Sequence, residues 1–172
     1  MKKYFFLGLV LFCQFNFAQK PCDANPKYNE FNFWIGEWDV YDLKGNQAGQ
    51  SKISKILDNC VILEEWTSAA AQQGLVFSGK SLNTYNTSTK QWQQTWVDNT
   101  GGSNEYLTGY FENDAMHFIS RPFSNGKDTS IRTITFYKLK DGKVRQLGEI
   151  SNDDGKTWTT EYDLEYRPKK LN

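Results

Sequence analysis

Short stretches in which apolar and polar residues alternate run through most of this chain, separated by turn residues roughly every ten positions. A period of two is typical of antiparallel strands with one buried face, whereas nothing after Ile35 repeats with the period of a helix. The pattern therefore argues against parallel strands joined by helices. The ten predicted strands are Glu37–Leu43, Ala48–Leu57, Val61–Ser68, Leu75–Tyr85, Gln91–Asp98, Glu105–Glu112, Ala115–Phe123, Ser130–Lys138, Lys143–Ser151 and Thr157–Arg167.

Several connections between these stretches contain residues that tolerate a positive φ angle. Hairpins are expected at Gly45-Asn46, Asp58-Asn59, Asn125-Gly126 and Asp141-Gly142. Strands joined in this way predict an all-β protein, an up-and-down antiparallel β-barrel of about ten strands, because closure leaves no open sheet edge.

An aromatic segment, Phe31–Tyr41, leads into the first strand. Tyr28–Ile35 can form a short helical turn that plugs one end of the barrel, and Gly36 lets the backbone turn sharply. Trp38 would then lie across the floor of the core. If the last strand pairs with the first, Arg167 can cap Trp38 through a cation–π contact; the alternative is a solvated terminal charge.

The first residues have the features of a secretory signal peptide. Lys2 and Lys3 form a basic start, Tyr4–Phe15 is an apolar core too short to span a bilayer, and cleavage is expected after Ala18. A lipid anchor at Cys13 is disfavoured because a bulky residue precedes it. We therefore expect an exported protein, periplasmic or extracellular. Its segments would be a signal peptide at 1–18, an N-terminal arm at 19–30 and a barrel domain at 31–172.

The net charge of the chain limits the classes of partner to be expected, and its cysteines indicate a possible disulfide. The chain has 20 basic and 20 acidic residues, and without the two lysines of the leader its net charge is −2. No basic stripe is present, so we expect no nucleic-acid partner, and no later apolar run is long enough for a membrane span. In an oxidising compartment Cys22 and Cys60 can form a disulfide; the alternative is one buried thiol and one exposed thiol.

The Gly36-Glu37-Trp38 start, the strand number and the terminal arginine resemble the calycin superfamily, which includes lipocalins and fatty-acid-binding proteins. Phe31–Val40, Lys90–Gly102 and Gly142–Trp158 are similar to an uncharacterised secreted bacterial family, a domain of unknown function with a lipocalin-like barrel. The resemblance covers nearly the whole mature chain. It implies the fold but no reaction. Classical lipocalins also end in a long helix that this chain lacks, which argues against lipocalin-type receptor docking.

Candidate ligand-binding residues share strand faces. Trp92, Gln94, Trp96 and Asp98 lie on one face, although alternation alone does not say whether that face points inward. An inward face would offer two aromatic walls with an amide and a carboxylate between them to an amphipathic ligand, whereas the alternative is a tryptophan pair packed in the core under a polar rim. Glu64 and Trp66 form a similar pair in the third strand.

Three charged residues, Arg132, Arg145 and Glu149, lie in the strands before the last. A charge inside a barrel must be paired or must meet a ligand charge, so an inward arginine could receive a carboxylate through a bidentate contact. The alternative is an outward cross-strand ion pair of small energetic value.

The segment Ser151–Trp158 matches the Asp-box pattern Ser-x-Asp-x-Gly-x-Thr-Trp, which repeats in sialidase propellers. A single copy in a short chain predicts a hairpin turn instead. Ser151 and Asp153 would bond the turn amides, Gly155 would take the left-handed conformation, and Trp158 would pack beneath.

Catalytic and cofactor motifs are sparse. No Gly-x-Ser-x-Gly, His-Glu-x-x-His or phosphate-binding glycine loop is present, and His117 is the sole histidine. Axial haem ligation by His117 is a hypothesis with no visible second ligand, so we expect no cofactor and no metal.

These observations favour an exported barrel that binds a small amphipathic or apolar molecule. Trp66, Trp92 and Trp96 would supply the walls, with Arg132 or Arg145 as polar anchors. Two alternatives remain: a cofactor-independent lyase, isomerase or hydrolase acting inside the barrel, or an interaction module with a filled core. The sequence leaves ligand identity, catalytic activity and oligomeric state open.

Overall fold

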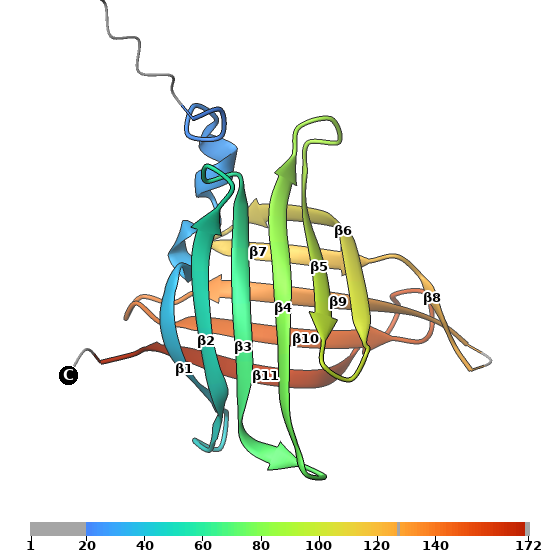
Figure 1. Ribbon diagram of the computed structural model, residues 1–172. Helices are drawn as coiled ribbons and strands as arrows, with labels where there is room; N and C mark the ends of the chain where they lie inside the picture. The colour runs from blue at the N-terminus through green and yellow to red at the C-terminus, as the bar shows by residue number, and fades with distance from the viewer. Residues whose placement is uncertain (1–19, 127, 171–172) are drawn as a thin grey trace, which may run out of the picture.

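The computed structural model describes residues 20–126 and 128–170 and forms a closed antiparallel β-barrel of ten strands (Figure 1). The predicted signal peptide at 1–18 lies outside the described residues. The predicted all-β barrel is confirmed. The described residues form eleven strands, of which all but β8 make up the barrel: β1 (Gly36–Asp42), β2 (Gln47–Ile56), β3 (Val61–Gln72), β4 (Leu75–Asn86), β5 (Gln91–Asp98), β6 (Ser103–Glu112), β7 (Ala115–Ser120), β8 (Phe123–Asn125), β9 (Asp128–Lys138), β10 (Val144–Ser151) and β11 (Thr159–Pro168).

The barrel closes where the two ends of the chain meet. Strand β11 pairs antiparallel with β1, so that Trp38 lies opposite Pro168 and Val40 lies opposite Tyr166. Every other barrel strand pairs with its neighbour in sequence, except that β7 pairs directly with β9. Closure therefore removes the open edges that ten separate strands would otherwise expose.

Strand β8 is the one departure from the predicted strand order. It pairs only with the start of β9 and forms a small hairpin beside the barrel. The prediction of one continuous strand over Ala115–Phe123 is wrong, because the strand ends at Ser120. Pro122 follows directly, and a residue without an N–H cannot continue the ladder.

A plug of aromatic side chains fills one end of the barrel. It is formed by two short 3₁₀ helices, η1 (Pro26–Asn29) and η2 (Asn32–Trp34). Phe31 and Trp34 are fully buried and stack with their ring centroids 4.9 Å apart, and Trp34 also packs 4.5 Å from Phe136. The Trp38 indole N–H donates a 2.9 Å hydrogen bond to the Trp34 carbonyl, which fixes the plug to β1.

The predicted cation–π contact between Arg167 and Trp38 is wrong. The Arg167 guanidinium lies 4.1 Å from the ring centroid of Tyr41, on the outer face of the barrel. Tyr166 points inward and packs edge-on against Trp38 at 6.2 Å. Because side chains alternate along a strand, the residue after Tyr166 must point outward.

A disulfide between Cys22 and Cys60 joins the N-terminal arm to the turn between β2 and β3, as predicted. The Cα atoms of the two cysteines are 5.1 Å apart. A hydrogen bond of 2.9 Å from the Asn59 amide to Asp23 lies beside it. The bridge therefore holds the chain that enters the plug.

The Asp-box segment is a hairpin turn between β10 and β11. Asp153 accepts hydrogen bonds from the backbone N–H and the hydroxyl of Thr157, at 2.8 and 2.6 Å. Together with a bond from Ser151, these contacts lower the pKa of Asp153 to about 2. Gly155 takes a left-handed φ of 84° as expected, and Trp158, although 39% exposed, packs against the turn and donates its indole N–H to the Gly155 carbonyl at 3.2 Å.

Candidate functional site

The half of the barrel away from the plug contains a cavity of about 580 Å³ that opens to solvent. Aromatic and aliphatic side chains form its wall, polar side chains form its floor, and an ion pair borders its mouth. The wall comprises Trp66, Phe77, Trp96, Tyr106, Ile134, Tyr162 and Leu164, whereas the floor comprises Glu64, Gln94, Gln146 and Tyr166.

Glycines in neighbouring strands make room for the wall. The ring of Trp66 lies over Gly49 of β2, and the ring of Trp96 lies over Gly79 of β4. A Cβ atom at either glycine would collide with the indole. Glycine weakens a strand interior, so its presence here marks a close approach of a ring to the backbone.

Glu64 is the central residue of the floor and is only 3% exposed. The hydroxyl of Ser51 donates to its Oε1 at 3.0 Å, and that of Ser81 donates to its Oε2 at 2.9 Å. Tyr166 Oη lies 3.2 Å from Oε1. Burial raises the pKa of Glu64 to about 7, while the hydrogen bonds from Ser81, Ser51 and Tyr166 act in the opposite direction. Glu64 is therefore a carboxyl group that can gain or lose a proton near neutral pH.

A chain of amides and hydroxyls fixes the orientation of the groups beside Glu64. The Gln94 amide donates to Asn83 Oδ1 at 2.7 Å, and Asn83 Nδ2 donates to Ser81 Oγ at 2.9 Å. Because Ser81 accepts from Asn83, its own proton points to Glu64. Hydrogen bonds within the floor therefore fix the orientation of its polar groups.

An ion pair between Arg132 of β9 and Glu161 of β11 borders the cavity. Arg132 Nε and Nη2 lie 2.8 and 3.0 Å from the two Glu161 carboxylate oxygens, a bidentate contact. Arg132 Nη1 also donates to Asn104 at 3.2 Å, and its guanidinium lies 4.7 Å from the ring centroid of Phe123. Glu161 raises the pKa of Arg132, which stays charged and already has a partner.

The structure brings together five of the eight residues predicted to bind a ligand. Glu64, Trp66, Gln94, Trp96 and Arg132 all line this one cavity.

The three remaining residues lie elsewhere. Trp92 is fully buried against Phe31 of the plug, 5.9 Å between ring centroids, so it belongs to the core. Arg145 and Glu149 do not line the cavity, and Arg145 forms a bidentate pair with Asp163 at 2.8 and 2.6 Å. Trp92 is therefore not a wall of this cavity and Arg145 is not an anchor in it, while Glu149 lines a separate hollow on the outer surface.

Sequence reasoning also missed residues that define the site. Ser51 of β2, Ser81 of β4, and Glu161 and Tyr166 of β11 come from three different strands and meet only once the strand pairing is fixed. The glycines opposite Trp66 and Trp96 were a usable signal, since glycine inside a strand indicates a ring or backbone packed close to it.

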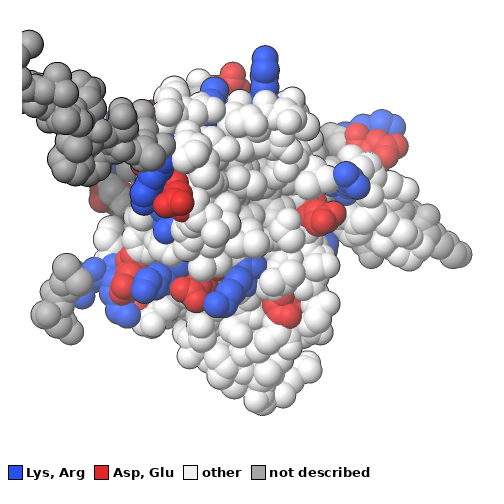
Figure 2. Space-filling view, turned by 45° about the horizontal axis from the view of Figure 1, so that its top comes forward, with Lys and Arg blue, Asp and Glu red and all other residues white. Residues whose placement is uncertain are grey.

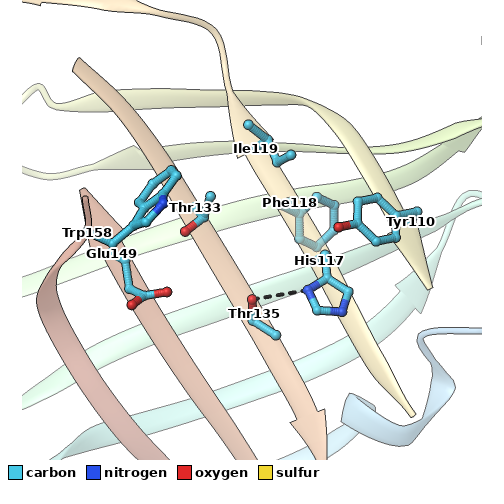
Figure 3. A pocket seen from close by; sticks show the side chains of 8 residues that line it. All are labelled: Tyr110, His117, Phe118, Ile119, Thr133, Thr135, Glu149 and Trp158. Atoms are coloured by element: carbon cyan, nitrogen blue, oxygen red, sulfur yellow. Dashed lines mark hydrogen bonds between the residues drawn. The ribbon is translucent and has the colours of Figure 1, made fainter. Parts of the chain in front are cut away.

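A second hollow, of about 190 Å³, lies on the outer surface over β6, β7, β9 and β10 (Figure 3). His117 stacks on Tyr110 at 4.9 Å, and its Nδ1 lies 3.3 Å from Thr135 Oγ1. Burial lowers the pKa of His117, so it is neutral at neutral pH. His117 is not a lining residue of the inner cavity, which leaves an interior haem without this axial ligand. The described residues contain no group of three or more potential metal ligands.

The charge distribution on the outer surface and the length of the helices are relevant to which partners the protein can have. On the face in Figure 2, lysines and arginines lie beside aspartates and glutamates, with no broad area of one charge. None of the helices in the described part of the chain has the length and apolar character needed to cross a bilayer.

The fold and the cavity together define an all-β barrel with a usable interior. The chain matches no known protein-family model, and no curated protein shows significant sequence similarity to it. The resemblance to a secreted bacterial family therefore stays a prediction.

Proposed function

We propose that this protein is an exported, lipocalin-like barrel that binds a small amphipathic molecule in its inner cavity. The observation that carries the proposal is a cavity of about 580 Å³ with an aromatic wall and an ordered polar floor. Ligand sites in proteins typically occupy roughly 300–1,000 Å³ and combine an apolar lining with a few placed polar groups. The disulfide between Cys22 and Cys60 is consistent with export to an oxidising compartment.

The cavity volume disfavours an interaction module with a filled core. Such a module would close its interior with side chains, since protein cores pack at crystal-like density. Here Trp66 and Trp96 leave space between them and the floor instead of filling it.

Native mass spectrometry of protein purified from its own host tests the proposal. We expect the wild-type protein to carry a bound small molecule. Leu164→Trp would fill the cavity and abolish the bound mass, whereas Leu82→Trp, at a side chain that is 48% exposed, would leave it unchanged. Empty wild-type protein that also binds no amphipathic probe would overturn the proposal.

A second candidate function, proton-transfer catalysis in the same cavity, is favoured by one observation. Glu64 has a pKa of about 7 and lies beside the Tyr166 hydroxyl, the kind of perturbed acid found where enzymes move protons. If the protein catalyses proton transfer, the wild-type protein should convert the host-derived molecule into a chemically different product, whereas Glu64→Gln should leave the molecule unchanged. Recovery of the same molecule from both proteins would support binding without catalysis.

A further inference from the structure

The charges of the cavity indicate what kind of polar group a ligand would bring. Three acidic or basic residues line the cavity: Glu64, Arg132 and Glu161. Arg132 and Glu161 neutralise each other through two hydrogen bonds of 2.8 and 3.0 Å. Within the described parts of the chain, no lysine or arginine forms an ion pair with Glu64. Glu64 is therefore the one acidic group of the cavity without a cationic partner.

Glu64 can hold a removable proton near neutral pH, because burial raises its pKa to about 7. Three hydroxyl groups donate to its carboxylate oxygens: Ser51 and Tyr166 to Oε1, at 3.0 and 3.2 Å, and Ser81 to Oε2, at 2.9 Å. Tyr166 Oη also lies 2.7 Å from Gln146 Oε1, so its single proton is shared between two acceptors. The floor therefore offers hydrogen bonds to an ionised Glu64 but no positive charge.

The groups that face Glu64 do not supply a compensating charge. Burial raises the pKa of Tyr106 to about 12 and that of Tyr162 and Tyr166 well above 10.0, so all three stay neutral. The facing groups are the hydroxyls of Ser51 on β2, Ser81 on β4, Tyr106 on β6, and Tyr162 and Tyr166 on β11, together with the Arg132–Glu161 pair.

Resting on the proposed binding function, we infer that the ligand is an amphipathic amine whose ammonium group pairs with the Glu64 carboxylate. Its apolar part would lie against Trp66 and Trp96, whose ring faces also attract a cation. On binding, the Glu64 O–H bond breaks and its proton passes to solvent. The hydroxyls of Ser51, Ser81 and Tyr166 then stabilise the carboxylate. A carboxylate ligand, in contrast, finds Arg132 already occupied.

A matched set of probes tests this assignment. Dodecylamine, dodecanol and dodecanoate share one chain and differ in the head group, and tryptophan fluorescence reports their binding. We expect dodecylamine to bind at least about tenfold more tightly than the other two at about pH 8. Below about pH 7 its affinity should fall by about tenfold per pH unit, with release of about one proton measured by calorimetry in buffers of different ionisation enthalpy.

Glu64→Gln keeps the shape and the neutral hydrogen bonds of the floor but cannot ionise. It should lose at least about tenfold in dodecylamine affinity and keep its dodecanol affinity. Glu149→Gln, which removes a carboxylate outside the cavity, is the matched control and should bind like wild type. If Glu64→Gln does not fold, the proton release and pH dependence of the wild-type protein decide the question.

The outcomes separate this inference from the function on which it rests. Equal or tighter binding of dodecanol or dodecanoate at about pH 8, or dodecylamine binding below about pH 7 without proton release, would overturn the amine assignment and leave cavity binding intact. If none of the three probes binds and the host-purified protein is empty, the binding function itself fails and the amine assignment fails with it.

Discussion

Tyr166 Oη lies 3.2 Å from Glu64 Oε1, although the two residues are 102 positions apart in the chain. Tyr166 reaches Glu64 only because β11 pairs with β1, where Tyr166 lies opposite Val40. The same hydroxyl lies 2.7 Å from Gln146 on the neighbouring strand. Barrel closure and assembly of the polar floor are therefore one event.

Glu64 should make the protein less stable as pH rises toward neutrality. Its folded-state pKa is about 7, against a reference value of 4.5, so the folded protein holds a proton that the unfolded chain has released between these values. The free energy of unfolding should fall across this window by on the order of 3 kcal/mol and level off above it. Urea denaturation from about pH 4.5 to pH 8 measures the change.

Glu64→Gln provides the control, because glutamine is neutral at every pH. The whole pH dependence predicted for this window should appear in the difference in unfolding free energy between wild type and Glu64→Gln. Asp153, with a pKa of about 2, titrates below this window and cancels in the difference. Parallel pH profiles for the two proteins would contradict a raised Glu64 pKa.

Tyr166→Phe should raise the pKa of Glu64 further. The Tyr166 hydroxyl lowers that pKa by hydrogen bonding, and its removal also leaves Gln146 Oε1 without its 2.7 Å donor. We expect a loss of about 1–2 kcal/mol in stability and a shift of the pH-dependent transition to higher pH. Tyr162→Phe, at a cavity tyrosine that makes no hydrogen bond to Glu64, should change this transition far less.

The sequence predicts strand positions well because turns and alternation are local signals. The fifth predicted strand has the observed bounds, Gln91–Asp98. The side of each strand that faces inward is harder to predict, because the floor of this cavity is polar. In β4, Ser81 and Asn83 point inward while Leu82 is 48% exposed, the reverse of the usual pattern. Polarity alone would therefore assign the wrong face here.

The alternation of apolar and polar residues also does not indicate how far along the barrel axis a side chain lies. Trp92 and Trp96 share an inward face, but Trp92 lies at the level of the plug and Trp96 at the level of the cavity. Arg145 lies outside because its neighbours Val144 and Gln146 are the buried residues. These placements follow from where the aromatic plug sits, which depends on long-range packing.

Gly79→Ala should disturb the cavity wall through Trp96. A Cβ atom at position 79 would collide with the indole, which must then move into or out of the cavity. We expect a loss of about 1–3 kcal/mol in stability, as for other overpacked positions, and a shift in tryptophan fluorescence. In a Trp96→Ala background the added methyl group should cost much less, and equal costs in both backgrounds would argue against this contact.

Loss of the disulfide should destabilise the plug. Cys22 and Cys60 are 38 positions apart, and closing a loop of this size is worth roughly 3–4 kcal/mol in the chain-entropy model. The Cys22→Ser/Cys60→Ser variant should therefore unfold at a lower urea concentration. Reduced wild-type protein should behave like this variant, whereas a loss below about 1 kcal/mol would show that the plug holds without the bridge.

Glu161→Gln should change the ligand preference of the cavity by freeing Arg132. In the wild-type protein the Arg132 guanidinium forms a bidentate contact with Glu161. Without the negative charge of Glu161, the guanidinium can bind the carboxylate of a ligand in the same geometry. Dodecanoate affinity, followed by tryptophan fluorescence, should rise by roughly tenfold or more. The outer pair of Arg145 and Asp163 has the same bidentate form, so Asp163→Asn frees an arginine outside the cavity and should give no gain. An equal gain in both variants would mean that dodecanoate responds to net charge and not to Arg132.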